Sequence, residues 1–259
     1  MMSRHIVTLW SGLKEPELPR LQYICMSSWL AQGYDVTVYC YKAIPNLPQG
    51  VQQASADEIL DRSEVFFVSG NNWAHFSDVF RLELLRQHLG TWLDADLLLL
   101  RPLPEDRPMI LGWERRNLVC NAAMAFPEHH EIPRLAMEYY RDGKLGPWAH
   151  AKPRWHKFLS MITGKKFDYS SMPHGHWGQH MLGYYNKKMA LYDQLLPQKA
   201  LYHPSTYDGS LFQAVPYDHL IDDEEVLGVH FFFKDADYEN PVPGSFFADM
   251  CGRHDPRGC

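Results

Sequence analysis

Residues 76–103 read FSDVFRLELLRQHLGTWLDADLLLLRPL, and this stretch decides how the chain folds. A helix is predicted over residues 77–89, because Gly90 supplies a stop and apolar side chains recur at helical spacing at Val79, Leu82, Leu85 and Leu89. Short buried strands are predicted at residues 91–93 and 97–100. Asp94 and Asp96 lie between these two strands, with Ala95 separating them.

The Asp-x-Asp pair has the chemistry of a cation site. Two nearby carboxylates are costly to bury unless a cation or a hydrogen-bond donor compensates their charge. Mg²⁺ and Mn²⁺ prefer oxygen ligands and are often held by one or two carboxylates together with substrate phosphates. In open α/β sheets, ligands gather at the carboxyl ends of the strands. The stretch therefore predicts a metal-bridged diphosphate site, with a solvated turn as the alternative interpretation.

The N-terminal part of the chain alternates strand and helix. A strand at residues 5–10, a helix at 15–31 and a strand at 35–41 make a βαβ unit, whose strands are parallel. We therefore expect an α/β fold with a mostly parallel central sheet flanked by helices. The remaining predicted elements are a loop at 42–55, a short helix at 56–62, strands at 109–113, 119–126 and 226–233, and helices at 131–141, 154–163 and 177–188.

Composition excludes several classes of protein. The 259 residues are 46% apolar and 22% charged, which is typical of a globular chain. The net charge of −6 argues against binding nucleic acid through a basic surface. Five widely spaced cysteines predict free thiols in a reducing compartment. No signal-peptide core and no apolar run of ~20 residues occurs, so we expect no transmembrane segment. A cytoplasmic protein follows, with a peripheral place at the inner membrane as an alternative.

Two further sets of polar residues are candidates for chemistry. Asp78 and Arg81 are three apart on the predicted helix, so they share a face. They form either a structural ion pair or a carboxylate and a guanidinium that grip a sugar and a phosphate. His230 lies in an apolar strand, where it is either a hydrogen-bonded core residue or a neutral metal ligand. A zinc site at the three histidines of residues 174–180 is disfavoured, because no His-Glu-x-x-His pattern occurs.

The same stretch carries several of these features at fixed spacing, namely Ser77-Asp78, Arg81, Gly90, Leu93-Asp94-Ala95-Asp96 and Arg101-Pro102. This block resembles the DXD-containing glycosyltransferase family thirty-two, which includes α-1,6-mannosyltransferases. α-1,4-Galactosyltransferases carry a related block, and the large glucosylating bacterial toxins share a more distant version. The combined spacing is far more specific than an Asp-x-Asp pair, which is common by chance.

Weaker similarity extends mostly over residues 5–126. Trp10 lies in Leu-Trp-Ser-Gly, similar to the family's N-terminal Ile-Trp-x-Gly, and Asn121 falls where an Asn follows the Asp-x-Asp strand. Gln179 lies in Gly-Gln-His-Met-Leu, where the family often has Gly-Pro-x-x-Leu, and His230 falls where a late His-rich strand is expected. The departures are Thr91 for the second Gly of a Gly-Gly pair, Gln179 for Pro, and a Phe-rich continuation after His230.

The resemblance implies a GT-A-like, nucleotide-sugar-binding fold. Residues 1–250 would form one domain, with a donor-binding half at about 1–126 and an acceptor-side half at about 127–250, followed by a loose tail at 251–259. The implied catalytic residues are Asp78, Arg81, Asp94 and Asp96, the implied donor contacts are Trp10, Asp78, Arg81, Asn121 and Gln179, and the implied metal ligands are Asp94, Asp96 and His230. Trp10 is otherwise a core residue at a strand end.

The activity implied is transfer of a hexose from a UDP- or GDP-hexose to an acceptor hydroxyl, with retention of configuration and with Mn²⁺ or Mg²⁺ bound. The acceptor would be a glycan, a lipid-linked sugar or a protein, in glycan or polysaccharide synthesis. Two alternatives remain open. One is a nucleotide-sugar-binding module without turnover, and the intact set of Asp and Arg residues argues against it. The other is a metal-dependent sugar nucleotidyltransferase. Such an enzyme usually needs a Gly-rich N-terminal loop with basic residues, and Ser-Gly-Leu-Lys at residues 11–14 matches that loop only weakly.

Overall fold

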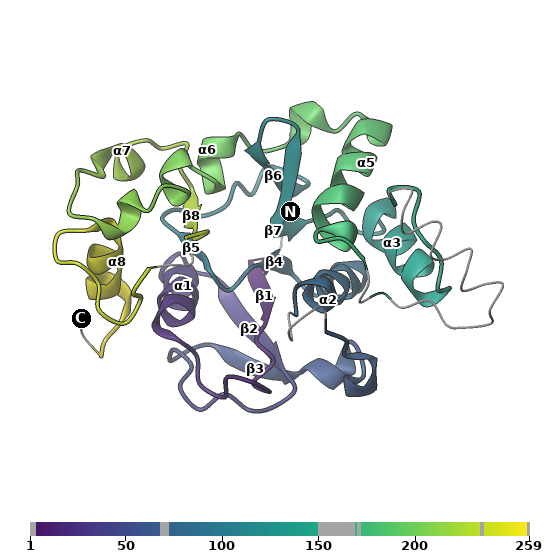
Figure 1. Ribbon diagram of the computed structural model, residues 1–259, viewed down its shortest axis with the longest axis horizontal. Helices are drawn as coiled ribbons and strands as arrows, with labels where there is room; N and C mark the ends of the chain where they lie inside the picture. The colour runs from purple at the N-terminus through teal and green to yellow at the C-terminus, as the bar shows by residue number, and fades with distance from the viewer. Residues whose placement is uncertain (1–3, 68–72, 150–168, 170–171, 234–235, 258–259) are drawn as a thin grey trace.

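A six-stranded sheet forms the centre of the molecule in the computed structural model, which describes residues 4–67, 73–149, 169, 172–233 and 236–257 (Figure 1). The strand order is β3-β2-β1-β4-β7-β6, and the bounds are β1 His5–Leu9, β2 Asp35–Cys40, β3 Gln52–Ser55, β4 Thr91–Leu93, β6 Ile110–Arg115 and β7 Leu118–Ala125. Neighbouring strands from β3 to β4 pair in parallel, whereas β7 is antiparallel to both β4 and β6. The predicted α/β fold with a mostly parallel central sheet is confirmed.

Helices cover both faces of this sheet (Figure 1). α1 (Arg20–Ala31) packs on one face with α8 (Phe246–His254) beside it, and α2 (Ala74–Arg86) packs on the other face with α3 (Glu131–Arg141). Successive side chains of a strand point to opposite faces. Accordingly, Ile6 of β1 lies in the apolar cluster around α1, and the adjacent Val7 lies in the cluster around α2.

A second, two-stranded sheet lies beside the first. β5 (Leu97–Leu99) pairs antiparallel with β8 (Gly228–His230), and Leu97 stands opposite His230. Helix α1 fixes the position of β5, because Trp29 Nε1 donates to the Leu97 carbonyl at 2.7 Å and Ser28 Oγ accepts from the Leu99 amide at 2.9 Å. The pairing therefore brings a late strand of the chain to the turn that holds Asp94 and Asp96.

Several boundaries differ from the prediction. α1 begins at Arg20 rather than at residue 15, because prolines at 16 and 19 disfavour the helical backbone in the residues before them. α2 lies three residues earlier than predicted, and it is followed by His88 and Gly90 with positive φ angles. The loop predicted at 42–55 is wrong for β3, a polar edge strand that lacks an apolar alternation.

The C-terminal part also departs from the prediction. The loose tail predicted from residue 251 is wrong up to His254, because α8 continues to that residue and buries Phe246, Phe247, Met250 and Cys251. The helix predicted at 177–188 is a π-type turn at His176–His180 followed by α5 (Met181–Met189), and the helix predicted at 154–163 lies outside the described residues. The remaining short elements are α6 Gln198–Leu201, α7 Asp218–Ile221 and 3₁₀ turns at Ala56–Glu58, Arg62–Glu64, Tyr192–Gln194, Pro204–Thr206 and Ser210–Phe212.

The structure also bears on the cysteines and on membrane-spanning helices, within the residues that it describes. Cys25, Cys40 and Cys120 are buried free thiols, as their wide spacing predicts. Among the helices that the structure describes, none is long and apolar enough to cross a membrane.

Candidate active site

The Asp-x-Asp pair occupies the turn that leaves the central sheet. Asp94 follows β4, and its amide donates to the Ala122 carbonyl on β7 at 2.7 Å. The chain then turns, with the Leu97 amide donating to the Asp94 carbonyl at 3.0 Å, and enters β5. The Phe231 amide donates to the Asp96 carbonyl at 3.1 Å, which continues the pairing with β8. The backbone of both aspartates is therefore fixed by two neighbouring strands.

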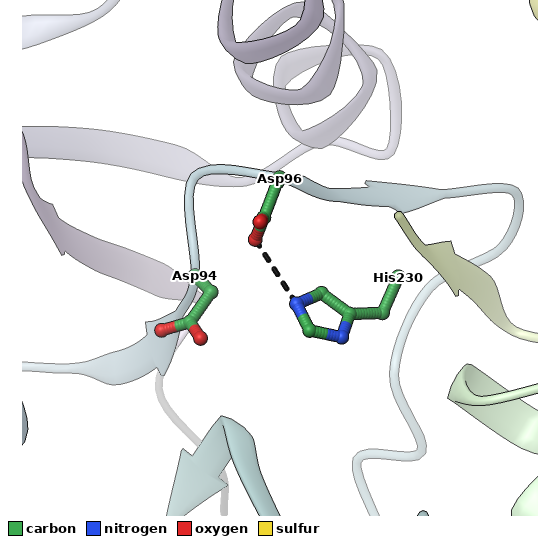
Figure 2. A group of neighbouring side chains, drawn as sticks. All are labelled: Asp94, Asp96 and His230. Atoms are coloured by element: carbon green, nitrogen blue, oxygen red, sulfur yellow. Dashed lines mark hydrogen bonds and ion pairs between the residues drawn. The ribbon is translucent and has the colours of Figure 1, made fainter. Parts of the chain in front are cut away.

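His230 joins the two aspartates to form a three-residue group (Figure 2). His230 Nε2 lies 3.0 Å from Asp96 Oδ1, and one ligand atom from each of Asp94, Asp96 and His230 lies within 4.8 Å of the others. The side chain of His230 is buried, whereas those of Asp94 and Asp96 are 23% and 37% exposed. Two carboxylates and an imidazole that face a common space fit a Mn²⁺-like cation, and solvent or substrate can supply further oxygen ligands.

Arg81 is a buried cation that links the helix α2 to this turn. Its Nη1 lies 3.0 Å from Asp94 Oδ1 and also donates to the Asn121 carbonyl, while Nη2 lies 3.4 Å from Asp78 Oδ1. Its guanidinium also stands over the Trp92 ring, 4.9 Å from the centroid. Asp94 Oδ1 additionally accepts from Trp92 Nε1 at 2.7 Å. These contacts fix one carboxylate oxygen of Asp94 and leave its other oxygen for a ligand.

Asp78 is a buried carboxyl group in the cavity lining, and burial disfavours its ionisation. Asn121 Nδ2 donates to Asp78 Oδ1 at 2.6 Å, and Arg81 lies alongside. The pKa of Asp78 is nevertheless raised to about 6, chiefly by burial and also by the negative charge of Asp94, which together outweigh the opposing effect of Arg81 and Asn121. Asp78 is therefore a carboxyl group that changes its protonation just below neutral pH.

The three residues of the candidate metal group shift one another's ionisation. Burial raises the pKa of Asp94, although Arg81 opposes this effect. Burial alone would also raise the pKa of Asp96, but the positive charge and the hydrogen bond of His230 lower it. Burial would lower the pKa of His230, and the Asp96 carboxylate raises it instead. Without a metal, these shifts favour an Asp96 carboxylate paired with a His230 imidazolium at pH values below the raised pKa of His230.

These side chains line one cavity of about 350 Å³. Its walls include the candidate residues Trp10, Asp78, Arg81, Asp94, Asp96, Asn121, Gln179 and His230. A second cavity of about 370 Å³ lies next to it, shares Leu9, Trp10 and Ser77, and adds Trp73 and Lys14. Trp10 belongs to both cavities and is only half-buried, so its ring is available for stacking on a ligand. The structure therefore brings every site residue predicted from the sequence to one place.

Sequence reasoning missed several residues of this site. Trp73 and Phe232 line the cavities, and Glu114 hydrogen-bonds to Gln179 on the cavity wall. Glu114 could have been found from strand alternation, because it shares a face of β6 with the buried Gly112, whereas Trp113 points to the other face. The predicted strand, 109–113, ends one residue before Glu114. Of the three histidines of residues 174–180, His174 lines the cavity. Among the described residues, Asp94, Asp96 and His230 form the one group of three or more potential metal ligands.

Comparison with known proteins gives no family assignment. No protein-family model matches the chain, and no curated protein matches it. Among solved structures, the chain is similar to one described as "PaToxG Glycosyltransferase", with 12% identity and a TM-score of 0.46 over 74% of this chain and 72% of that chain. It is also similar to an active-site mutant of LgtC, with 9% identity and a TM-score of 0.41 over 96% of this chain and 95% of that chain.

Proposed function

We propose that this protein is a metal-dependent glycosyltransferase that moves a hexose from a nucleotide-diphosphate sugar to an acceptor hydroxyl. The observation that supports the proposal best is that His230, 134 residues from Asp96 in the sequence, meets Asp94 and Asp96 on the wall of one cavity. The buried pair of Asp78 and Arg81 lies in the same cavity. This combination agrees with the sugar-transferase block in the sequence.

The two adjoining cavities suggest how a donor would lie. The cavity with Trp10 and Trp73 offers aromatic faces for a nucleobase, and its neighbour offers carboxylates and a guanidinium for the diphosphate and the hexose. Mn²⁺ or Mg²⁺ at Asp94, Asp96 and His230 would neutralise charge on the departing nucleoside diphosphate. In the transfer, the bond from the anomeric carbon to the diphosphate oxygen would break, a bond to the acceptor oxygen would form, and the acceptor hydroxyl would give its proton to the departing diphosphate.

The residues of the chain would have distinct tasks in this reaction. Asp78 and Asn121, which are hydrogen-bonded to each other in the cavity lining, would bind sugar hydroxyls, and Arg81 would hold Asp94 in place and face the diphosphate. The proposal includes a UDP- or GDP-hexose donor, retention of configuration, and an acceptor in glycan or polysaccharide synthesis. The proposal also divides the chain into a donor-binding half at about 1–126 and an acceptor-side half at about 127–250. It assigns the protein to the cytoplasm.

A panel of UDP-glucose, UDP-galactose and GDP-mannose, incubated with the protein and Mn²⁺, tests this function. We expect release of nucleoside diphosphate with at least one donor, and loss of that release in EDTA or in Asp96→Asn. Asp106→Asn is the matched control, because Asp106 is an exposed carboxylate outside the cavity. Formation of UTP or GTP and a hexose 1-phosphate when pyrophosphate is added would instead indicate a nucleotidyltransferase, and metal-dependent binding without turnover would indicate a binding module.

A further inference from the structure

We propose that Glu114 is a positioning residue for Gln179. It fixes the side-chain amide of Gln179 so that the amide oxygen accepts a hydrogen bond from a hydroxyl group of the donor sugar. The identity of this ligand rests on the proposed function. The contact between Glu114 and Gln179 does not, and it can be tested without any ligand.

Glu114 is a buried carboxylate in an unusual place. It lies near the end of β6, it is 6% exposed, and its Oε2 accepts a hydrogen bond from Gln179 Nε2. Gln179 belongs to the π-type turn before α5 and lines the cavity that holds the candidate metal ligands. A hydrogen bond to an ionised group is stronger than one between neutral groups. The contact therefore joins the edge of the central sheet to a residue of the cavity wall.

A carboxylate partner also decides which way the amide points. An ionised carboxylate only accepts hydrogen bonds, whereas an amide has an NH₂ donor at one end and an oxygen acceptor at the other. Turning the Gln179 amide over would place its oxygen against the Glu114 carboxylate, which is electrostatically unfavourable. Glu114 thus holds Nε2 on its own side and leaves Oε1 as the free end. Among the described residues, no donor reaches this oxygen.

The surroundings hold both partners in this arrangement. The Glu114 carbonyl accepts from the Tyr207 hydroxyl at 3.2 Å, and the Tyr207 ring stacks on Phe232 at 4.6 Å with an interplanar angle of 12°. On the other side of Gln179, Gly175 has a left-handed backbone with φ 76°, and a Cβ atom there would lie 3.5 Å from Oε1. The free amide oxygen therefore lies close to Gly175, and both residues line the cavity.

The consequence is a preference for one kind of ligand group. An oxygen that can only accept selects a hydroxyl, and a sugar that lacks this hydroxyl leaves the oxygen without a donor. Glu114→Gln keeps the size of the side chain but can offer either an oxygen or an NH₂ group to Gln179. The Gln179 amide can then adopt both orientations, so the discrimination should be lost while the protein stays folded.

The first measurement is made without ligand. The side-chain amide signal of Gln179 in a nitrogen-15 NMR spectrum is identified by its absence in Gln179→Met. We expect Glu114→Gln to move this signal toward that of an ordinary glutamine, and we expect Glu224→Gln, which changes an exposed carboxylate elsewhere, to leave it in place. An unchanged signal in Glu114→Gln would overturn the proposal.

The second measurement uses sugar nucleotides. The donor that the protein hydrolyses best among UDP-glucose, UDP-galactose and GDP-mannose is compared with its 2-, 3-, 4- and 6-deoxy forms. We expect one deoxy form to lose about tenfold in kcat/KM with the parent and with Glu224→Gln, and about twofold with Glu114→Gln. Equal discrimination by the parent and Glu114→Gln overturns the proposal. If no sugar nucleotide binds or reacts, the proposed function fails, and the NMR measurement still decides the role of Glu114.

Discussion

His230 Nε2 lies 3.0 Å from Asp96 Oδ1, although 134 residues separate the two in the sequence. The antiparallel pairing of β5 with β8 makes this contact, because it sets Leu97 opposite His230. A turn between two apolar strands would otherwise be a common structural feature. Because β8 places His230 beside this turn, the turn has a third potential ligand and is a candidate metal site.

The contact makes metal binding depend on pH. The Asp96 carboxylate raises the pKa of His230 above its usual 6.5, so the protonated pair stabilises the metal-free protein at low pH. This stabilisation is complete below ~6.5, the value in the unfolded chain, and is lost as pH rises through the raised pKa of the folded state. A metal requires neutral imidazole, so Mn²⁺ should displace a proton and bind more weakly as pH falls.

Calorimetric titration with Mn²⁺ near pH 7, in two buffers with different ionisation enthalpies, measures this proton release. We expect the parent to release up to one proton per Mn²⁺, and His230→Gln to bind more weakly and release fewer. His129→Gln is the matched control, because His129 is exposed and does not line the cavity. Equal Mn²⁺ affinity in the parent and His230→Gln would remove His230 from the metal site.

Much of this site could be predicted from the sequence, because its parts are local. One helix-and-strand unit, α2 followed by β4, carries or directly precedes all four acidic and basic residues, namely Asp78, Arg81, Asp94 and Asp96. Their spacing in the sequence therefore predicts that they lie near the end of β4. The place of His230 follows from a long-range strand pairing, which a single sequence does not specify. Edge strand β3 was missed because its side chains face solvent and carry no apolar pattern. The start of α1 was misplaced because prolines set it rather than hydrophobic periodicity.

Arg81→Lys should impair the protein strongly although it conserves the charge. The planar guanidinium contacts Asp78, Asp94 and the Asn121 carbonyl at the same time and also stands over the Trp92 ring. A lysine ammonium cannot reproduce this fork or the stacking. We expect kcat/KM for donor turnover to fall about a hundredfold, whereas Arg86→Lys on the same helix should leave turnover close to that of the parent, because Arg86 and its partner Glu83 lie outside the cavity lining. Near-parent turnover by Arg81→Lys would make the Asp78–Arg81 pair a structural salt bridge.

Gly178→Ala should displace two side chains of the cavity lining, Asn121 and Asp78. A Cβ atom at Gly178 would lie 2.4 Å from Asn121 Nδ2 and 3.2 Å from Asp78 Oδ2, so the bonded pair would have to move. Such overpacking costs roughly 1–3 kcal/mol of unfolding free energy, and donor binding should weaken with it. Gly183→Ala in α5 is the matched control, since a Cβ atom there has no neighbour within 4 Å. Because alanine favours a helix, the control should be slightly stabilised, and thermal unfolding of both variants checks the opposite signs.

Asp78→Asn should make the protein more stable and less active. The pKa of Asp78 is raised to about 6 in the folded state, chiefly by burial, so ionisation of this group opposes folding. A raised pKa contributes stability at pH below the unfolded value near ~4, and that contribution is lost as pH rises through about 6. An asparagine cannot ionise, and its amide can still hydrogen-bond to Asn121 after rotation. Urea unfolding should therefore show Asp78→Asn gaining roughly 2 kcal/mol relative to the parent at pH 8 and far less at pH 4. The same variant should lose donor turnover, because the carboxylate that would accept from a sugar hydroxyl is gone. A variant less stable than the parent at pH 8 would show that the ion pair with Arg81 outweighs the cost of burying the charge.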